Sequence, residues 1–368
     1  MEKAMSLEQT RNGRNESGLT YPCDAPPATG KAIELAPGIL WMRMPLPFQL
    51  SHINVWAIKD SGGWGLVDTG ISSTETAAAW RQLFAGVFSG SVVTRVFVTH
   101  MHPDHIGMAG WLTRKFDCRL WISRLEYLNC RVLGADTGRE APDAGVRFYR
   151  MAGWDEDAIE SYRTRFGAFG KMIYALPESY RRLQDKEEIE IGAHRWKVVI
   201  GNGHSPEHVC LYCPALKLLI SGDQVLPRIS SNVSVFPTEP DADPLADWLD
   251  SLRKLKSEVP NDVLVLPSHN EPFLGLHQRI NALENSQLRA LGRLRDALRQ
   301  PLRVIDVFGA LFSRPITSEH FLMSMATGES IAHLNYLIHR GEVSMKVGED
   351  GIAWYQMLAS VQGIPGTD

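Results

Sequence analysis

The densest cluster of potential metal ligands in the sequence lies in the nine-residue run THMHPDHIG, which carries His100, His102, Asp104 and His105. Imidazole nitrogens and carboxylate oxygens are the protein ligands that zinc, iron and manganese accept. Because alternate residues of an extended segment point to one side, His100 and His102 should face a common point. The turn that starts at Pro103 would bring Asp104 and His105 to the same cavity. A histidine-rich polar turn without function is the disfavoured alternative.

Apolar strands must position these ligands. The run at 92–98 is short, β-branched and apolar, which is typical of a buried strand that feeds a loop at its carboxyl end. Three later apolar runs end in Gly or Pro turns that present His204, Asp223 and His269, and Asp68 also follows an apolar run. Taken singly, each of these residues has a structural interpretation, which for Asp68 is capping of the next turn. Together they predict one ligand-bearing edge of a layered α/β domain.

This order of motifs resembles the metallo-β-lactamase-fold hydrolases, of the kind that includes glyoxalase II, over about residues 33–273. The resemblance implies a four-layered αββα sandwich with two divalent metal ions at one edge, zinc in the first place and iron or manganese as alternatives. The implied ligands are His100, His102 and His204 for one metal, Asp104, His105 and His269 for the other, and Asp223 as the bridge. Asp68 would support a ligand without binding metal itself.

Two residues narrow the activity that the resemblance implies. Relatives that use two irons for oxygen or nitric oxide chemistry typically have Glu where this chain has His102, so His102 favours hydrolysis. β-Lactamases of this fold generally lack the bridging carboxylate that Asp223 supplies, which disfavours antibiotic hydrolysis.

The chemistry of such a site follows from its metals and from the leaving group. Two divalent ions would lower the pKa of a shared water from about 15.7 toward 7, and Asp104 and Asp223 would orient the pair as the catalytic carboxylates. A thiolate, whose conjugate acid has a pKa of about 8.5, leaves unaided, whereas an amine needs a proton donor that the motif does not identify. We therefore predict cleavage of a thioester of the acyl-CoA or acyl-glutathione type by metal-bound hydroxide, with a lactone or ester as the alternative substrate.

A long segment at 124–185 separates the first motif from His204 and is expected to be a helical insert near the substrate. Its best-marked helix starts near Asp155 and carries aromatic residues at helical spacing, including Tyr162 and Phe166. These two side chains are the predicted substrate-binding residues, because ligand pockets are lined by apolar and aromatic groups. Packing of the insert onto the sandwich explains them equally well.

The pattern turns helical after His269, with leucines 288, 291, 294 and 298 in one stripe and a hairpin near the end. Residues 276–368 are therefore expected to form a C-terminal helical domain that resembles the winged-helix-like tail of many single-chain hydrolases of the fold. Some relatives with this tail are endoribonucleases, so a single-strand-specific endoribonuclease stays open, as does a metal-binding module without turnover. The tail has no clustered basic face, which favours packing or homodimer formation over nucleic-acid binding.

Composition bounds the remaining possibilities. The 368 residues carry a net charge of −4, and no apolar run approaches the length of a membrane span. Residues 1–30 are polar, lack a signal-peptide core and are expected to form a flexible arm on a cytoplasmic protein, before a catalytic domain at 31–275. The Cys210–Cys213 pair suggests a redox or zinc motif, but its spacing within a strand favours core cysteines. The expected partner is a small acyl thioester or lactone, with no membrane partner.

Overall fold

Two compact units make up the chain in the computed structural model, which describes residues 18–47, 50–313, 315–316 and 320–359. The first unit contains the described residues between 18 and 137, together with 167–231 and 251–281. The second unit contains 138–166, 232–250 and the described residues between 282 and 359. Residues 1–17 of the predicted arm lie outside the described residues, and the predicted domain boundaries stay a prediction.

A seven-stranded sheet forms the first half of the first unit, with its strands in sequence order from β1 to β7. The first four strands form an antiparallel meander, and β4 to β7 are parallel. The strands are β1 (Ala32–Ala36), β2 (Ile39–Pro45), β3 (His52–Asp60), β4 (Gly63–Val67), β5 (Val92–Phe97), β6 (Arg119–Ile122) and β7 (Arg181–Arg182).

A six-stranded sheet forms the other half, in the order β13-β12-β11-β10-β9-β8. Its neighbours are antiparallel apart from β11 and β12, which are parallel and therefore end at the same edge. The strands are β8 (Glu188–Ile191), β9 (His194–Gly201), β10 (His208–Cys213), β11 (Leu218–Gly222), β12 (Leu264–Pro267) and β13 (Phe273–Leu274).

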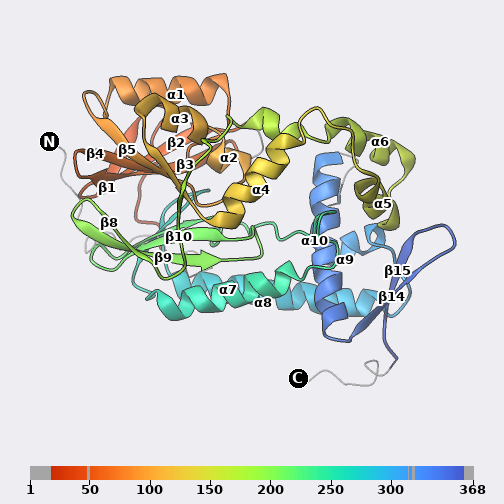
Figure 1. Cartoon of the computed structure of the whole chain (residues 1–368). Coiled ribbons are helices and arrows are strands. Elements are labelled where there is room, and N and C mark those ends of the chain that lie inside the picture. Colours follow the sequence, from red (N-terminus) through yellow and green to blue (C-terminus); the bar gives the residue numbers. More distant parts are fainter. Residues whose placement is uncertain (1–17, 48–49, 314, 317–319, 360–368) are drawn as a thin grey trace. The chain divides into compact units, whose positions relative to one another are not determined.

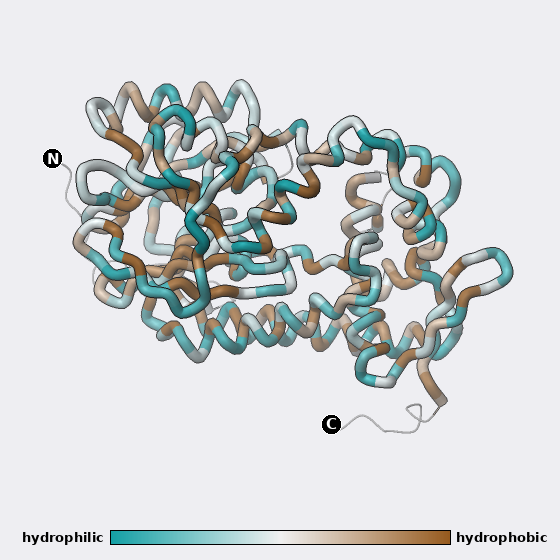
Figure 2. Tube along the Cα trace, in the orientation of Figure 1, coloured by the Kyte–Doolittle hydropathy of each residue, from teal (hydrophilic) through white to brown (hydrophobic). Residues whose placement is uncertain are grey.

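The two sheets pack face to face through a buried core to which both contribute. Trp41 and Trp56 of the first sheet stack with ring centroids 6.1 Å apart and share this core with Trp196 of the second. Figure 2 shows hydrophobic residues concentrated along the strands. Strand β3 is a nearly continuous apolar run because both of its faces are buried. Val55 lies in the core between the first sheet and its helices, and Trp56 lies in the core between the two sheets.

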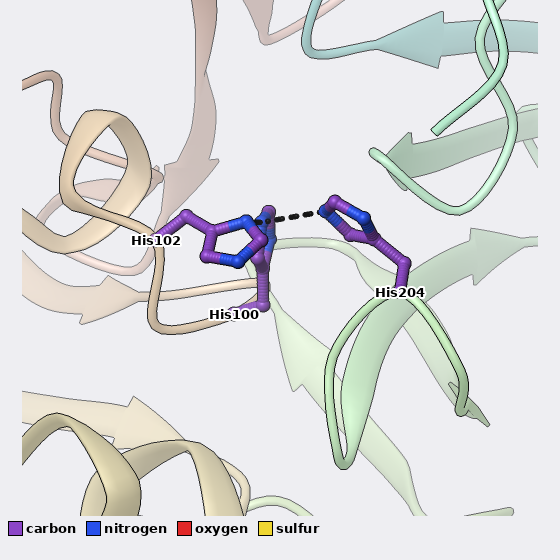
Figure 3. Close-up of side chains that lie close together, drawn as sticks. All are labelled: His100, His102 and His204. Carbon is purple, nitrogen blue, oxygen red and sulfur yellow. Dashed lines mark hydrogen bonds between the residues drawn. The ribbon is translucent and has the colours of Figure 1, made fainter. Parts of the chain in front are cut away.

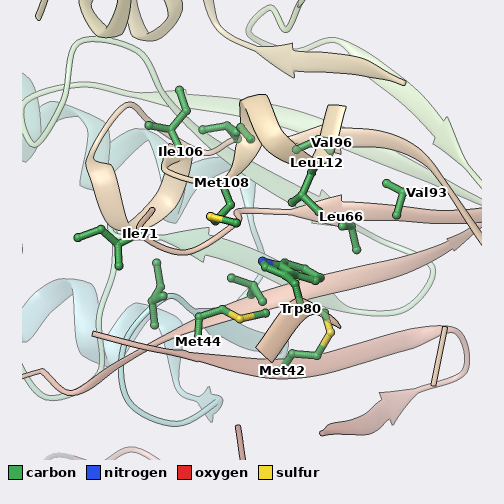
Figure 4. Close-up of a cluster of buried hydrophobic side chains, with 14 of the residues drawn as sticks. Met42, Met44, Leu66, Ile71, Trp80, Val93, Val96, Ile106, Met108 and Leu112 are labelled. Atoms are coloured by element: carbon green, nitrogen blue, oxygen red, sulfur yellow. The ribbon is translucent and has the colours of Figure 1, made fainter. Parts of the chain in front are cut away.

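Helices α1 (Thr74–Ala85) and α3 (Ala109–Phe116) cover the outer face of the seven-stranded sheet (Figure 1). Ser73 caps α1 by accepting a hydrogen bond from the Thr76 N–H at 3.1 Å, as its position before an apolar-periodic segment favours. Trp80 of α1 and Leu112 of α3 are completely buried in the cluster that Figure 4 shows.

The outer face of the six-stranded sheet is covered by the part of α7 (Pro244–Glu258) from Ser251 onward and by the start of α8 (Leu276–Ala297). Lys254 of α7 donates to the carbonyl of Ile200 in β9 at 2.8 Å. Helix, sheet, sheet and helix form the αββα sandwich, which confirms the predicted fold class.

The predicted insert is helical, and its elements are divided between the units. It contains α4 (Arg124–Ala135), α5 (Asp143–Met151), α6 (Glu156–Arg165) and the 3-10 turn η1 (Ala168–Met172). The predicted helix at Asp155 exists and is capped by the Asp155 side chain, but Phe166, which was predicted to lie on it, is the residue after its end. It stops before Phe166, because Gly167 adopts a left-handed conformation with φ of 73° and redirects the chain.

The second unit has α10 (His320–His339) at its centre. On α10, the buried Thr327 accepts a hydrogen bond from the Trp154 indole N–H at 2.9 Å, and His333 bonds to Gln287 of α8 at 2.8 Å. The short turns η2 (Ile305–Val307) and α9 (Phe308–Leu311) precede it, and the hairpin of β14 (Val343–Val347) and β15 (Ala353–Met357) follows. The predicted leucine stripe is wrong at Leu288, which is 52% exposed, whereas the three later leucines are fully buried.

All five cysteines are free, and Cys210 and Cys213 are buried in β10, as predicted for core cysteines. Among the described residues, no helix has both the length and the apolar character that crossing a membrane requires.

Candidate metal centre

The first ligand loop follows β5 and runs into the short helix α2 (Pro103–Ile106). Pro103 occupies the first turn of α2, where its missing N–H costs no hydrogen bond, and His102 is the residue before the helix. The helical turn places the Asp104 carboxylate 3.7 Å from Nε2 of His105 and 3.4 Å from Nε2 of His269. The His105 backbone is fixed in turn, because its carbonyl accepts hydrogen bonds from the Thr69 N–H at 2.8 Å and the Thr69 hydroxyl at 2.7 Å.

His100, His102 and His204 converge from two loops, as Figure 3 shows. The Nε2 atom of His100 lies 2.9 Å from Nδ1 of His102 and 3.3 Å from Nε2 of His204. Burial, together with the neighbouring imidazoles, holds the pKa of His100 well below its usual range and lowers that of His102 to about 3. Both rings are therefore neutral, which is the form that binds metal.

Asp104, His105 and His269 form a second group of candidate ligands. Nε2 of His105 lies 3.7 Å and Nε2 of His269 lies 3.4 Å from the Asp104 carboxylate. Burial opposes protonation of His269, but the charges of Asp223 and Asp104 outweigh it and raise its pKa to about 10. Burial also opposes protonation of His105, but the charges of Asp104, Asp68 and Asp223 outweigh it and hold the pKa of His105 well above its usual range.

Asp223, which follows β11, lies between the two groups. Its carboxylate is 3.6 Å from Nε2 of His204, 3.5 Å from Nε2 of His105 and 3.6 Å from Nε2 of His269. The structure thus brings together all seven side chains that the sequence predicts as metal ligands, and Asp223 stands where the predicted bridge would be.

Asp68 supports His105 from behind. Its carboxylate accepts hydrogen bonds from Nδ1–H of His105 at 2.8 Å and from the Thr99 N–H at 2.8 Å. A carboxylate can only accept, so Asp68 keeps a proton on Nδ1 of His105 and leaves Nε2, which lies 3.5 Å from Asp223, as the nitrogen that a metal ion would take. Asp68 achieves this from a left-handed backbone conformation with φ of 60°, which Asp tolerates better than most residues.

His269 is oriented by the backbone of β3. Its Nδ1 lies 3.1 Å from the carbonyl oxygen of His52, which leaves Nε2 toward the two aspartates. The buried Asn54 fixes the loop around His269, because its side-chain amide donates to the carbonyls of Pro267 at 2.8 Å and Asn270 at 2.7 Å. Sequence reasoning missed Asn54, whose amide N–H groups donate to carbonyls more than 200 residues away.

His208 and Glu126 are two further supports that sequence reasoning missed. The Asp223 N–H donates to Nε2 of His208 at 3.0 Å, and a side chain on Gly222 would collide with that ring, since its Cβ would lie 2.4 Å from Nε2. Glu126 on α4 is completely buried and accepts from the Met101 N–H. Burial raises the pKa of Glu126 to about 7, against its hydrogen bonds, which lower it. The His-x-x-x-His spacing of His204 and His208 was the one local signal available.

The predicted substrate-binding residues belong to the second unit. Tyr162 of α6 packs its ring 4.7 Å from Tyr149 of α5 and 6.1 Å from Phe166, between ring centroids. Their role in substrate binding stays a prediction.

The side chains of the centre fit divalent metal ions. Nε2 of His105 and Oδ1 of Asp223 are buried and have no hydrogen-bond partner in the described structure. Buried polar atoms without a partner are costly unless a cation or another group takes them up. The imidazoles of His100 and His102 are neutral, and a metal ion beside Asp104 and Asp223 would displace the protons that these carboxylates hold on His105 and His269. Imidazole and carboxylate together are the ligand chemistry of zinc, iron and manganese sites.

Comparison with protein-family models shows the family to which the chain belongs. The model of the Metallo-beta-lactamase superfamily matches residues 49–269, which contain all seven candidate ligands. The chain belongs to this superfamily. A second model, the Metallo-beta-lactamase-like C-terminal domain, matches residues 291–358. Members of the superfamily are generally metal-dependent hydrolases, so this chain is a superfamily hydrolase with candidate metal-binding groups.

Solved structures of the superfamily extend over both parts of the chain. The crystal structure of a beta-lactamase domain protein from Burkholderia ambifaria is 40% identical, covers 92% of this chain and 98% of its own, and has a TM-score of 0.84. A metallo-beta-lactamase family protein from Thermus thermophilus is 25% identical, with 88% and 100% coverage and a TM-score of 0.74. An uncharacterized protein from Aquifex aeolicus (strain VF5) is 23% identical over 231 residues, which are 62% of this chain and 90% of that protein.

Proposed function

We propose that this superfamily hydrolase holds two divalent metal ions and cleaves thioesters of the acyl-CoA or acyl-glutathione type. The single observation that carries the proposal is the convergence of seven candidate ligands in three overlapping groups, with Asp223 within 3.6 Å of both His204 and His269. His100, His102 and His204 would hold one ion and Asp104, His105 and His269 the other. Ions bound there would lower the pKa of a water and polarise the scissile carbonyl.

The protein side chains contribute orientation. Asp68 and the His52 carbonyl each fix one imidazole proton away from the cavity, on His105 and His269. The Asp223 N–H donates a hydrogen bond to Nε2 of His208, which fixes the backbone of the loop and keeps the Asp223 carboxylate between the groups. Such pre-organisation matters because misplaced groups must otherwise be ordered during the reaction.

The leaving group distinguishes thioesters from amides. In the described part of the site, the ligand side chains and Asp68 are all committed to the ligand groups or to their support, and none is placed as a proton donor. A thiol has a pKa of about 8.5, so a thiolate can depart without protonation, whereas an amine leaves only when it is protonated. This argument supports thioesters first and lactones or oxygen esters second.

A matched panel tests the proposal. Thioester, oxygen ester and amide substrates with the same acyl group should be cleaved with catalytic efficiency falling in that order. His102→Ala and Asp223→Ala should lose both activity and metal content, measured by elemental analysis. Rapid metal-dependent cleavage of a short single-stranded RNA with negligible thioester turnover would replace the proposal by a nuclease. Two bound ions without turnover on any substrate would indicate a binding module.

A further inference from the structure

The buried carboxylate of Glu126 joins the two loops that carry the three histidines. Its Oε2 accepts a hydrogen bond from the Met101 N–H at 2.8 Å, and its Oε1 accepts one from the Glu207 N–H at 2.9 Å. Met101 lies between His100 and His102, and Glu207 lies three residues after His204. One side chain on α4 therefore contacts the backbone of both loops at once.

Glu207 completes the connection in the reverse direction. Its carboxylate accepts from the Leu125 N–H at 2.8 Å, in the first turn of α4, and its backbone carbonyl accepts from the Ser123 hydroxyl at 2.7 Å. A carboxylate at a helix N-terminus is favourable because the first N–H groups lack partners within the helix. The start of α4 and the His204 loop thus hold each other, and we call Glu126 and Glu207 the carboxylate clamp.

An apolar side chain would fill the position of Glu126 at lower cost, because a buried carboxylate loses its hydration. What an apolar residue could not do is accept two backbone N–H groups from separate loops. Neither loop amide belongs to a strand ladder, so without Glu126 both would need another acceptor in a dry environment. This requirement explains a carboxylate at the position better than packing does.

We propose that the carboxylate clamp is the positioning device for the metal at His100, His102 and His204, and that it leaves the metal at Asp104, His105 and His269 largely unaffected. The inference rests on the proposed dinuclear centre. All three ligands of the first group come from the two loops that the clamp joins, so the clamp sets the distance between them. The second group takes Asp104 and His105 from the α2 end of the first loop, where Thr69 holds the His105 carbonyl, and His269 from a loop that Asn54 holds.

Glu126→Gln tests the clamp with little change of shape. Glutamine retains one carbonyl oxygen as an acceptor, but its NH2 group replaces the second oxygen and meets a backbone N–H, so one loop loses its anchor. Loss of a support behind metal ligands typically weakens metal binding by roughly 10- to 100-fold. We expect this loss for one of the two ions and less than about threefold change for the other.

Asp60→Asn is the matched control. Asp60 is also a buried carboxylate in the first unit, and it accepts from Arg95, Thr94 and backbone N–H groups. It lies at the far end of β3 from His52, away from the ligand loops. The control reports what the loss of a buried carboxylate does to metal binding through stability alone.

The experiment uses the full chain, stripped with a chelator and titrated with zinc by calorimetry and by metal analysis at fixed free zinc. Glu126→Gln should lower the affinity for one of the two zinc ions. In a His102→Ala background it should lower the affinity no further, because the three-histidine group has already lost a ligand. Hydrogen exchange at Met101 and Glu207 should accelerate. Glu207→Ala, which leaves the buried contacts intact, should weaken the same ion by several-fold and serves if Glu126→Gln does not fold.

Two ions bound with wild-type affinity in folded Glu126→Gln would overturn the clamp, as would equal weakening of both ions or an effect matched by Asp60→Asn. Wild-type protein that binds no zinc would instead refute the proposed dinuclear centre. The two failures are therefore distinguishable.

Discussion

Replacement of Asp68 by Asn isolates one hydrogen bond behind the second ligand group. The variant keeps the size of the side chain, and Asn tolerates the left-handed backbone conformation as well as Asp does, so no backbone strain is added. The Asn carbonyl can still accept from the Thr99 N–H. Its NH2 group cannot accept from Nδ1–H of His105, which loses both its partner and the force that fixes its proton on Nδ1.

The expected magnitude follows from that single loss. A hydrogen bond to a charged group contributes about 1.5–3 kcal/mol, and about 1.4 kcal/mol corresponds to a factor of ten in an equilibrium constant. Zinc affinity of the group formed by Asp104, His105 and His269 should therefore fall by roughly 10- to 100-fold. The group of His100, His102 and His204 should retain its ion, because in the described structure Asp68 reaches this group indirectly, through hydrogen bonds to Thr99.

The assay is metal analysis after dialysis at a free zinc concentration at which the wild type retains two ions. Asp68→Asn should retain about one, and adding His102→Ala should remove the other. Melting of the chelator-treated variant checks that the fold is intact. A folded Asp68→Asn protein that keeps both ions would refute the role of Asp68, and so would a loss confined to the three-histidine group.

Two further predictions concern stability and selectivity. Burial raises the pKa of Asp60, but hydrogen bonds from Arg95 and Thr94 outweigh burial and lower this pKa from an ordinary 3.8 to about 2. The ionised Asp60 should therefore contribute about 2 kcal/mol to the free energy of unfolding above pH 4, and this contribution is lost as the pH falls through about 2. The difference in unfolding free energy between wild type and Asp60→Asn, measured in denaturant from pH 5 to pH 2, should shrink accordingly, and a constant difference would contradict the assignment. Tyr162→Ala should change the relative catalytic efficiency among acyl chain lengths with metal content intact, whereas one common loss for every chain length would place selection elsewhere.

The convergence of the candidate ligands was predictable because their chemistry is distinctive. Few arrangements other than a metal site place three imidazoles and a carboxylate directly after a buried strand, and the later strand-end residues repeat the pattern. The layered α/β domain was predicted from apolar runs and turns, which act over a few residues, and the four-layered sandwich was implied by the resemblance that the motifs carry. In both cases the information is local in the sequence.

The supports were not predictable for the opposite reason. Glu126 and Asn54 act on backbone groups that are 25 to more than 200 residues away, and nothing in their neighbourhood distinguishes them from ordinary polar residues. The prediction that Leu288 is buried was wrong for a geometric reason. Successive helical residues are rotated by about 100° about the helix axis, so Leu288 lies to one side of the three leucines that follow. Helical spacing alone does not locate the centre of the buried face.

The supports also divide the centre into parts that depend on different regions of the chain. Asp68 and Asn54 come from the first sheet and act on His105 and His269, whereas Glu126 and Glu207 join α4 to the loops of His100 and His204. Asp223 is held separately, through His208. In the proposed dinuclear site, Asp223 would be the carboxylate shared by the two ions, because it lies 3.6 Å from both His204 and His269. We therefore expect a change in α4 to act first on the ion at His100, His102 and His204, and to reach the other ion through Asp223.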